Sequence, residues 1–486
     1  MAEFTPMMQQ YLQTKEEYKD CILFYRLGDF YEMFFEDAEL VSKELELTLT
    51  GKNCGMEERA PMCGIPYHAV EGYLNKLVAN GHKVAICEQV EDPKLAKGLV
   101  RREVIRIVTP GTNLDMQALD ESKNNYIMCI VYLADRYGVS IADVSTGDYY
   151  VTEVDSERKL FDEITKFSPS EIICNESFYM SGVDIEDLRH RLKITIYALE
   201  TWYFGDELAE TTLLTHFKVK SLEALGLADY DCGMIAAGAL LKYLYETQKN
   251  DLNNISVIHP YSTGKYMIID SSTRRNLELT ETLREKQKRG SLLWVLDKTK
   301  TAMGARMLRK MIEQPLIHKT AIQDRLDAVE MLKDNLMARE ELREYMNSIY
   351  DLERLTMKVS YRSANPRDLI SFKTSIQYLP YIKDILAQFS KGVLAKMAGD
   401  LDTLEDLHEL LEASIEEDGI IKEGFDEEID HLKKAKTDGK TWLAELEERE
   451  REKTGIKNLR VRYNKVFGYY IEVTNSYKDL VPEYYI

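Results

Sequence analysis

The sequence lacks long apolar runs, paired cysteines and clustered histidines. No apolar run approaches the roughly 20 residues that a membrane-spanning helix needs. The first ten residues have neither the basic nor the apolar segment of a secretory signal, so we expect a cytoplasmic protein. The seven cysteines, at positions 21, 54, 63, 87, 129, 174 and 232, include no Cys-x-x-Cys pair, and the eight histidines stand singly. We therefore predict reduced, mostly buried thiols, no disulfide framework and no metal site.

A phosphate-binding loop is also missing. The nearest match to Gly-x-x-x-x-Gly-Lys-[Ser/Thr] is Gly439-Lys440-Thr441, but lysine stands at position 434, where the motif needs its first glycine. The tripeptide lies in a segment with helical spacing and does not follow a strand, so we interpret the match as coincidental. These 486 residues are therefore expected to hydrolyse no ATP and to bind no cofactor.

The formal net charge is −20, which is unusual for a protein that binds nucleic acid, because phosphate contacts use lysine and arginine. The basic residues are nevertheless clustered. Residues 453–471 contain five of them, four aromatic residues and no acid, and residues 94–106 contain five with one acid, Glu103. Such patches can meet phosphates while the net charge limits non-specific binding, although a solvated strand face is the alternative. The candidate DNA-backbone contacts are Arg101, Arg102, Arg106, Lys457, Arg460, Arg462 and Lys465.

The sequence pattern changes along the chain, whose length suggests about three domains. Residues 1–112 indicate a mixed α/β part, and the polar, turn-rich residues 113–125 indicate a linker. Residues 126–250 again combine strands and helices, beginning with a meander of three strands. Residues 251–444 carry helical spacing and end in a long helix rich in Glu and Lys, and residues 445–486 begin a β-rich part. The fold class predicted is multidomain, with two α/β parts, an all-α part and the start of a β-rich part.

Local patterns predict several individual elements. Asp270 and the two serines after it have the side chains that begin a helix. Gly439 lies inside the long carboxy-terminal helix and weakens the prediction that this helix is continuous. In the first part we expect strands near 21–35 and 83–90 and helices near 36–47 and 70–80.

The most informative stretch is Phe30-Tyr31-Glu32. Gly28-Asp29 supplies a turn between two apolar-aromatic runs, and a strand after this turn places Phe30 and Glu32 on the same side. An aromatic ring beside a carboxylate suits the binding of a polyanion only if the ring wedges into a base step and the carboxylate hydrogen-bonds a base edge. The alternative, a core Phe30 beside a solvated Glu32, would be favoured for an arbitrary Phe-x-Glu.

Five blocks of the sequence closely resemble the amino-terminal part of bacterial MutS mismatch-repair proteins. The resemblance implies that Phe30 stacks on a mispaired or unpaired base of a DNA duplex and that Glu32 hydrogen-bonds the same base. The blocks are long, ungapped and in the order found in the family, namely Thr5-Pro-Met-Met-Gln-Gln-Tyr-Leu12, Leu23-Phe-Tyr-Arg-Leu-Gly-Asp-Phe-Tyr-Glu32, Gly64-Ile-Pro-Tyr-His-Ala69, Val84-Ala-Ile-Cys-Glu-Gln89 and Arg106-Ile-Val-Thr-Pro-Gly-Thr112.

The resemblance also implies an identity for each part. Residues 1–112 would form a mismatch-recognition domain, 126–250 an RNase H-like connector domain, 251–444 a helical core and lever, and 445–486 the start of a clamp domain. Family members continue into an ATPase domain that binds ATP and Mg²⁺, and that domain is not in this sequence. The partners expected for the full-length family are mismatched double-stranded DNA, a second copy of the chain and a MutL-type protein, at the bacterial nucleoid.

Two other functions stay open. An RNase H-like domain could be a metal-dependent nuclease in which Asp135, Asp143 and Asp148 hold Mg²⁺ ions. All three lie at turns, where aspartate commonly bonds the local backbone, and the connector domain of the family is not a nuclease. The other alternative is a non-enzymatic scaffold whose helices bind repair proteins. Metal-dependent DNA cleavage would identify the nuclease, and equal binding of matched and mismatched duplexes would favour the scaffold.

Overall fold

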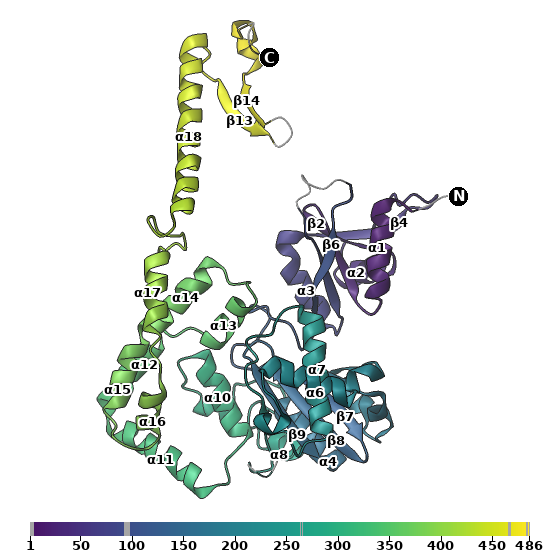
Figure 1. The fold of residues 1–486 in the computed structure, drawn as a ribbon, viewed down its shortest axis with the longest axis vertical. Coiled ribbons are helices and arrows are strands. Elements are labelled where there is room, and N and C mark those ends of the chain that lie inside the picture. Colours follow the sequence, from purple (N-terminus) through teal and green to yellow (C-terminus); the bar gives the residue numbers. More distant parts are fainter. Residues whose placement is uncertain are drawn as a thin grey trace. The chain divides into compact units, whose positions relative to one another are not determined.

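The computed structural model describes residues 4–91, 98–262, 264, 266–464, 468–482 and 485 (Figure 1). Contacts within the chain divide it into two compact units, Met1–Leu404 and Glu405–Ile486. Among the described residues, no helix is both long enough and apolar enough to cross a membrane.

A six-stranded sheet forms the amino-terminal part of the first unit. Its strand order is β3-β4-β2-β1-β5-β6, with β1 and β5 parallel and the other neighbours antiparallel. Apolar clusters lie on both faces of the sheet, because successive residues of each strand point to opposite sides. The predicted strands and helices of this part are confirmed, whereas α1, β3, β4 and β6 were not predicted. The elements are α1 (Pro6–Glu17), β1 (Ile22–Leu27), β2 (Phe30–Phe34), α2 (Phe35–Glu44), β3 (Thr50–Lys52), β4 (Ala60–Pro66), α3 (Val70–Ala79), β5 (Val84–Gln89) and β6 (Arg102–Val108).

A second six-stranded sheet follows in the order β11-β10-β7-β8-β9-β12. The predicted meander is confirmed as β7, β8 and β9, each antiparallel to the next. Helix α7 packs against β8 so closely that a Cβ on Gly138 would lie 2.0 Å from the carbonyl oxygen of Cys232. Strand β12 pairs with β9, so this sheet extends beyond residue 250, where the sequence pattern placed the change to helices. The elements are β7 (Ile127–Leu133), β8 (Arg136–Asp143), β9 (Asp148–Val154), α4 (Glu157–Phe167), β10 (Glu171–Cys174), α5 (Ile185–His190), β11 (Thr195–Ala198), α6 (Asp206–Phe217), α7 (Cys232–Gln248) and β12 (His259–Pro260).

Helices make up the rest of the first unit, as the spacing predicted. Asp270 caps the first of them, because its carboxylate accepts a hydrogen bond of 2.7 Å from the backbone N–H of Thr273. The helices are α8 (Ser271–Asn276), α9 (Leu292–Leu296), α10 (Ala302–Glu313), α11 (Lys319–Asp334), α12 (Leu336–Met346), α13 (Leu352–Ser360), α14 (Pro366–Gln377), α15 (Leu379–Ala387) and α16 (Gly392–Asp400).

Two buried arginines attach the predicted linker, residues 113–125, to the helical part. Arg306 on α10 donates to the carbonyl oxygen of Glu121 at 3.0 Å and is only 4% exposed. Arg354 on α13 donates to the carbonyl oxygens of Asp120 and Lys123, at 3.2 and 2.8 Å. The linker backbone is therefore held by side chains that follow it by more than 180 residues in the sequence.

The second unit consists of helices α17 (Glu405–Ser414) and α18 (Glu427–Thr454) and the hairpin β13 (Arg460–Asn464) and β14 (Gly468–Glu472). Helix α18 passes through Gly439 without a break, which confirms the predicted long helix. The P-loop-like tripeptide therefore lies in a helix, as expected. The boundary predicted at residue 445 falls inside α18, and the first strand begins at Arg460.

All seven cysteines are free, and all are buried, which confirms the predicted burial. Burial raises the pKa of the Cys21 and Cys87 thiols to about 12, so both stay protonated at neutral pH. They therefore serve as small apolar side chains.

Candidate nucleic-acid interface

Phe30 begins strand β2 directly after the β1–β2 turn. Leu27 pairs with Phe30 across the hairpin, so Gly28 and Asp29 alone form the turn. Gly28 has a φ of +60°, which the first central position of a type II′ turn requires and which glycine adopts without strain. The carbonyl oxygen of Asp29 accepts a 3.0 Å hydrogen bond from the backbone N–H of Tyr67. The turn is thus fixed both by its own geometry and by the neighbouring chain.

The side chains of β2 alternate between the core and a more open face. Tyr31 and Met33 are buried, whereas Phe30 is 46% exposed. Complete burial of a Phe side chain stabilises a folded protein by about 1.5–3 kcal/mol, and a half-exposed ring gains only part of that free energy. Core packing alone therefore does not explain the Phe at this position. Glu32 lies two residues further on and therefore on the same face as Phe30, as predicted.

Gly64 of β4 lies opposite Glu32 in the sheet. A Cβ at position 64 would lie 3.7 Å from both the Cγ of Glu32 and the Cδ1 of Phe30. Because glycine has no side chain, no atom of residue 64 stands between the ring and the carboxylate. Residue 64 therefore covers neither group with a side chain.

Glu32 is paired with Lys52, a residue that the sequence analysis did not single out. The Lys52 Nζ lies 2.5 Å from Oε2 of Glu32, and the Glu32 side chain is 16% exposed. Lys52 comes from β3, which reaches Glu32 only because β3 pairs with β4 and β4 with β2. The carboxylate is thus held in one place and its charge is balanced, without any local signal in the sequence.

The three predicted contacts on and before β6 differ in their surroundings. Arg101 is exposed and pairs with Glu103, also exposed. Arg102 donates to the carbonyl oxygens of Arg26 and Val100 and to Gln10, at 2.8–3.1 Å, so its guanidinium serves the domain itself. Arg106 is half-buried. Burial lowers the pKa of its guanidinium, and the nearby charge of Glu71 offsets part of that effect. Arg101 is the most available of the three.

The predicted basic-aromatic cluster lies before and on the β13–β14 hairpin of the second unit. Lys457, Arg460 and Arg462 are exposed, and Arg462 Nε lies 2.6 Å from Oε2 of Glu472. Lys465 lies outside the described residues. The strand register sorts the hairpin into a basic face with Arg460, Arg462, Tyr470 and Glu472, and an apolar face with Val461, Tyr463, Tyr469 and Ile471.

The three aspartates of the nuclease alternative do not converge. Asp143 and Asp148 face each other at one end of β8, whereas Asp135 precedes its other end. The carboxylate of Asp143 is fully buried and accepts hydrogen bonds from Ser145 and Asn124 at 2.7–2.8 Å. Within the described ranges, no group of three or more His, Cys, Asp or Glu side chains could hold a metal ion. The aspartates bond local groups, as residues at turns commonly do.

Comparison with known families matches three consecutive parts of the chain. Residues 5–117 match MutS domain I, residues 125–256 match MutS domain II, and residues 272–475 match MutS domain III. The chain is similar along its whole length to proteins named DNA mismatch repair protein MutS. Identity is 64% to the protein from Lachnoclostridium phytofermentans, 54% to that from Acetivibrio thermocellus and 52% to that from Ruminiclostridium cellulolyticum.

The chain spans about half the length of these curated relatives, 53% of the first and 57% of the other two. The three domain matches follow one another in chain order, and the most similar of these relatives shares nearly two thirds of the residues. The chain therefore belongs to the MutS family.

Proposed function

We propose that this chain binds DNA duplexes that contain a mispaired or unpaired base, with Phe30 stacking on that base and Glu32 accepting a hydrogen bond from it. The observation that carries the proposal is the half-exposed ring of Phe30 at a rigid turn, beside a fixed carboxylate on the same strand face. The relatives' name, DNA mismatch repair protein, agrees with this reading.

Discrimination would come from the energy needed to unstack a base. A mispaired base leaves the helix stack at lower cost than a paired one, so a wedging ring meets less resistance at a mismatch. Stacking of a base on an aromatic side chain contributes about 1–3 kcal/mol. Glu32 can only accept hydrogen bonds when ionised, so it favours a base edge that offers a donor and disfavours phosphate oxygens.

The remaining family properties are part of the same proposal. Arg101, Lys457, Arg460 and Arg462 would contact phosphates, and this binding would weaken as salt is added. The second sheet would be the RNase H-like connector, α18 the lever and β13–β14 the start of the clamp. We propose that ATP and Mg²⁺, a second copy of the chain and a MutL-type partner would act with a longer protein of this family.

The direct test compares labelled duplexes that are identical except for one base pair. Fluorescence anisotropy should show that the chain binds a G·T or single-base-insertion duplex more tightly than the matched duplex. Equal affinity for all three, at several salt concentrations, would contradict mismatch recognition and favour the scaffold. Metal-dependent cleavage of any of the duplexes would favour the nuclease.

Removing the carboxylate should help binding where there is no mismatch. In Glu32→Ala the matched duplex should bind up to about fivefold more tightly, because a negative charge is lost and Lys52 loses its partner. The preference for a mismatch should fall at the same time. Gel-shift titrations on matched DNA measure the first effect. Unchanged or weaker binding of matched DNA would argue against a Glu32 that faces the duplex.

Removing the lysine should have the opposite effect. In Lys52→Met the carboxylate of Glu32 loses its counter-charge, so matched duplex should bind about two- to fivefold more weakly. The matched control is Lys43→Met, which removes an exposed lysine from α2 of the same domain. If both variants weaken binding equally, the effect reflects net charge alone, and the role assigned to the Glu32–Lys52 pair is wrong.

A further inference from the structure

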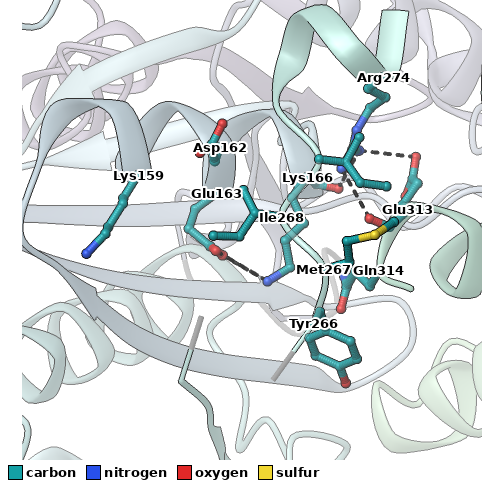
Figure 2. A pocket seen from close by; sticks show the side chains of 11 residues that line it. Lys159, Asp162, Glu163, Lys166, Tyr266, Met267, Ile268, Arg274, Glu313 and Gln314 are labelled. Carbon is teal, nitrogen blue, oxygen red and sulfur yellow. Dashed lines mark hydrogen bonds and ion pairs between the residues drawn. The ribbon is translucent and has the colours of Figure 1, made fainter. Parts of the chain in front are cut away.

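A large cavity lies among helices α4, α8 and α10, within the first unit. Its volume is about 450 Å³, and its walls come from residues 123–126, from α4 and the loop after it, and from α8 and α10. Two neighbouring cavities share Lys166 and Gln314 with it. Figure 2 shows one of these neighbours, with Arg274 beside Glu313 and Lys166 paired with Glu163. The volume is within the range of small-molecule sites.

The lining of this cavity is strongly basic, although the whole chain has a net charge of −20. Two acidic residues, Glu281 and Glu313, are set against nine basic ones. The basic residues are Lys123, Lys166, Arg191, Arg274, Arg275, Lys286, Arg306, Arg309 and Lys310.

Carboxylates pair with six of the nine cations but not with the other three. The pairs are Lys166 with Glu163, Arg191 with Asp187, Lys286 with Glu281, Arg306 with Asp351 and Glu353, and both Arg274 and Arg309 with Glu313. Arg274 and Arg309 share the single carboxylate of Glu313, each at 3.6 Å. Among the described residues, Lys123 and Arg275 form no ion pair. Lys310 donates to a neutral hydroxyl, that of Tyr150, at 2.6 Å, and pairs with no carboxylate of the described residues. Three cations of the lining, Lys123, Arg275 and Lys310, are therefore left without a carboxylate partner in the described part of the chain, and they are the excess positive charge of the cavity.

Buried donors point to the same conclusion. Arg274 is nine-tenths buried and its Nε has no hydrogen-bond acceptor in the described part of the chain. The Nε of Arg306 and the Nε of Arg309 also lack an acceptor in the described part of the chain. Buried guanidinium groups normally have acceptors for their N–H groups, so three such donors around one cavity indicate a missing anionic acceptor.

We propose that this cavity binds a small anion that carries phosphate groups, of the size of pyrophosphate or a nucleotide. Arginine suits this ligand because its fork of N–H donors matches the spacing of phosphate oxygens. More than one phosphate is needed to balance the excess of cations. This site is independent of the mismatch proposal, because Phe30 and Glu32 lie on the other sheet.

Isothermal titration of the 486-residue chain with pyrophosphate tests the site, at fixed ionic strength. We expect saturable binding, weakened about tenfold or more in Arg309→Met and measurably in Arg275→Met. Arg275 is exposed, so its variant should fold even if Arg309→Met does not. The control is Arg367→Met, which removes an exposed arginine on α14, away from the cavity lining. No binding by the parent chain, or equal loss in the control, would overturn the proposal.

Further titrations identify the source of the phosphate. AMP and ADP are compared with pyrophosphate and with citrate, a polyanion without phosphorus. Tighter binding of ADP than of pyrophosphate indicates a nucleotide, and the reverse indicates a free polyphosphate. Both results support the site. Citrate that binds as tightly as pyrophosphate would overturn the assignment to phosphate.

Discussion

Phe30→Ala should abolish the preference for mismatched over matched duplex while leaving weak, salt-sensitive DNA binding. The ring is the group proposed to stack on the displaced base, and stacking contributes about 1–3 kcal/mol, or about five- to 150-fold in affinity. Matched DNA does not gain this contact, so its affinity should change little. Anisotropy titrations with G·T and matched duplexes, at two salt concentrations, measure both effects.

The folded structure should survive this substitution. Phe30 is 46% exposed, so removing its ring takes away only part of the burial of a core aromatic residue. Trp202→Ala is a suitable control. Trp202 is also 46% exposed, but it lies in the short helix Thr201–Phe204, which follows β11 of the second sheet. A Phe30→Ala protein that keeps the parent's preference for G·T would show that the ring does not read the mismatch.

The part of this site that depends on local sequence could be predicted. Gly28-Asp29 specifies a tight turn, and strand alternation places Phe30 and Glu32 on one face, so neither inference needs distant residues. The long helix α18 and the capped start of α8 follow from equally local signals. Whether Phe30 belongs to the core or to the surface could not be decided from the pattern alone. The exposed fraction of its ring decides that question.

Other features depend on contacts between distant residues. Lys52 reaches Glu32 through two strand pairings, and neither β3 nor β4 was predicted. Arg102 carries the same charge as Arg101 in the sequence, yet its guanidinium bonds backbone that is 76 residues away. The basic cavity collects side chains from residues 123 to 314, so even the most basic of these stretches, residues 298–312 with five basic residues and no acid, supplies only part of its lining. Charge counts along a sequence therefore miss sites that the fold assembles.

Arg306→Met should destabilise the first unit by about 3–5 kcal/mol, because it leaves the carboxylate of Asp351, whose side chain is 9% exposed, without its cation. Arg306 donates to Asp351 at 2.7 and 2.8 Å and to Glu353 at 2.6 Å, and it is 4% exposed. These hydrogen bonds raise the pKa of Arg306 against the effect of burial, so the guanidinium stays charged. The same side chain holds the carbonyl oxygen of Glu121, so the linker should open more often as well.

Urea unfolding and hydrogen exchange at the amides of residues 118–125 measure these two effects. Arg339→Met is the matched control, because the side chains of Arg339 and its partner Glu340 are 38% and 58% exposed, and such a pair contributes less than about 1 kcal/mol. The double variant Arg306→Met, Asp351→Asn should be more stable than Arg306→Met alone, since it removes the buried charge that the first change leaves unpaired. Asparagine can still cap α13 in place of Asp351, so the cap itself should survive. If the double variant is instead less stable, the loss in Arg306→Met comes from packing and not from an unpaired carboxylate.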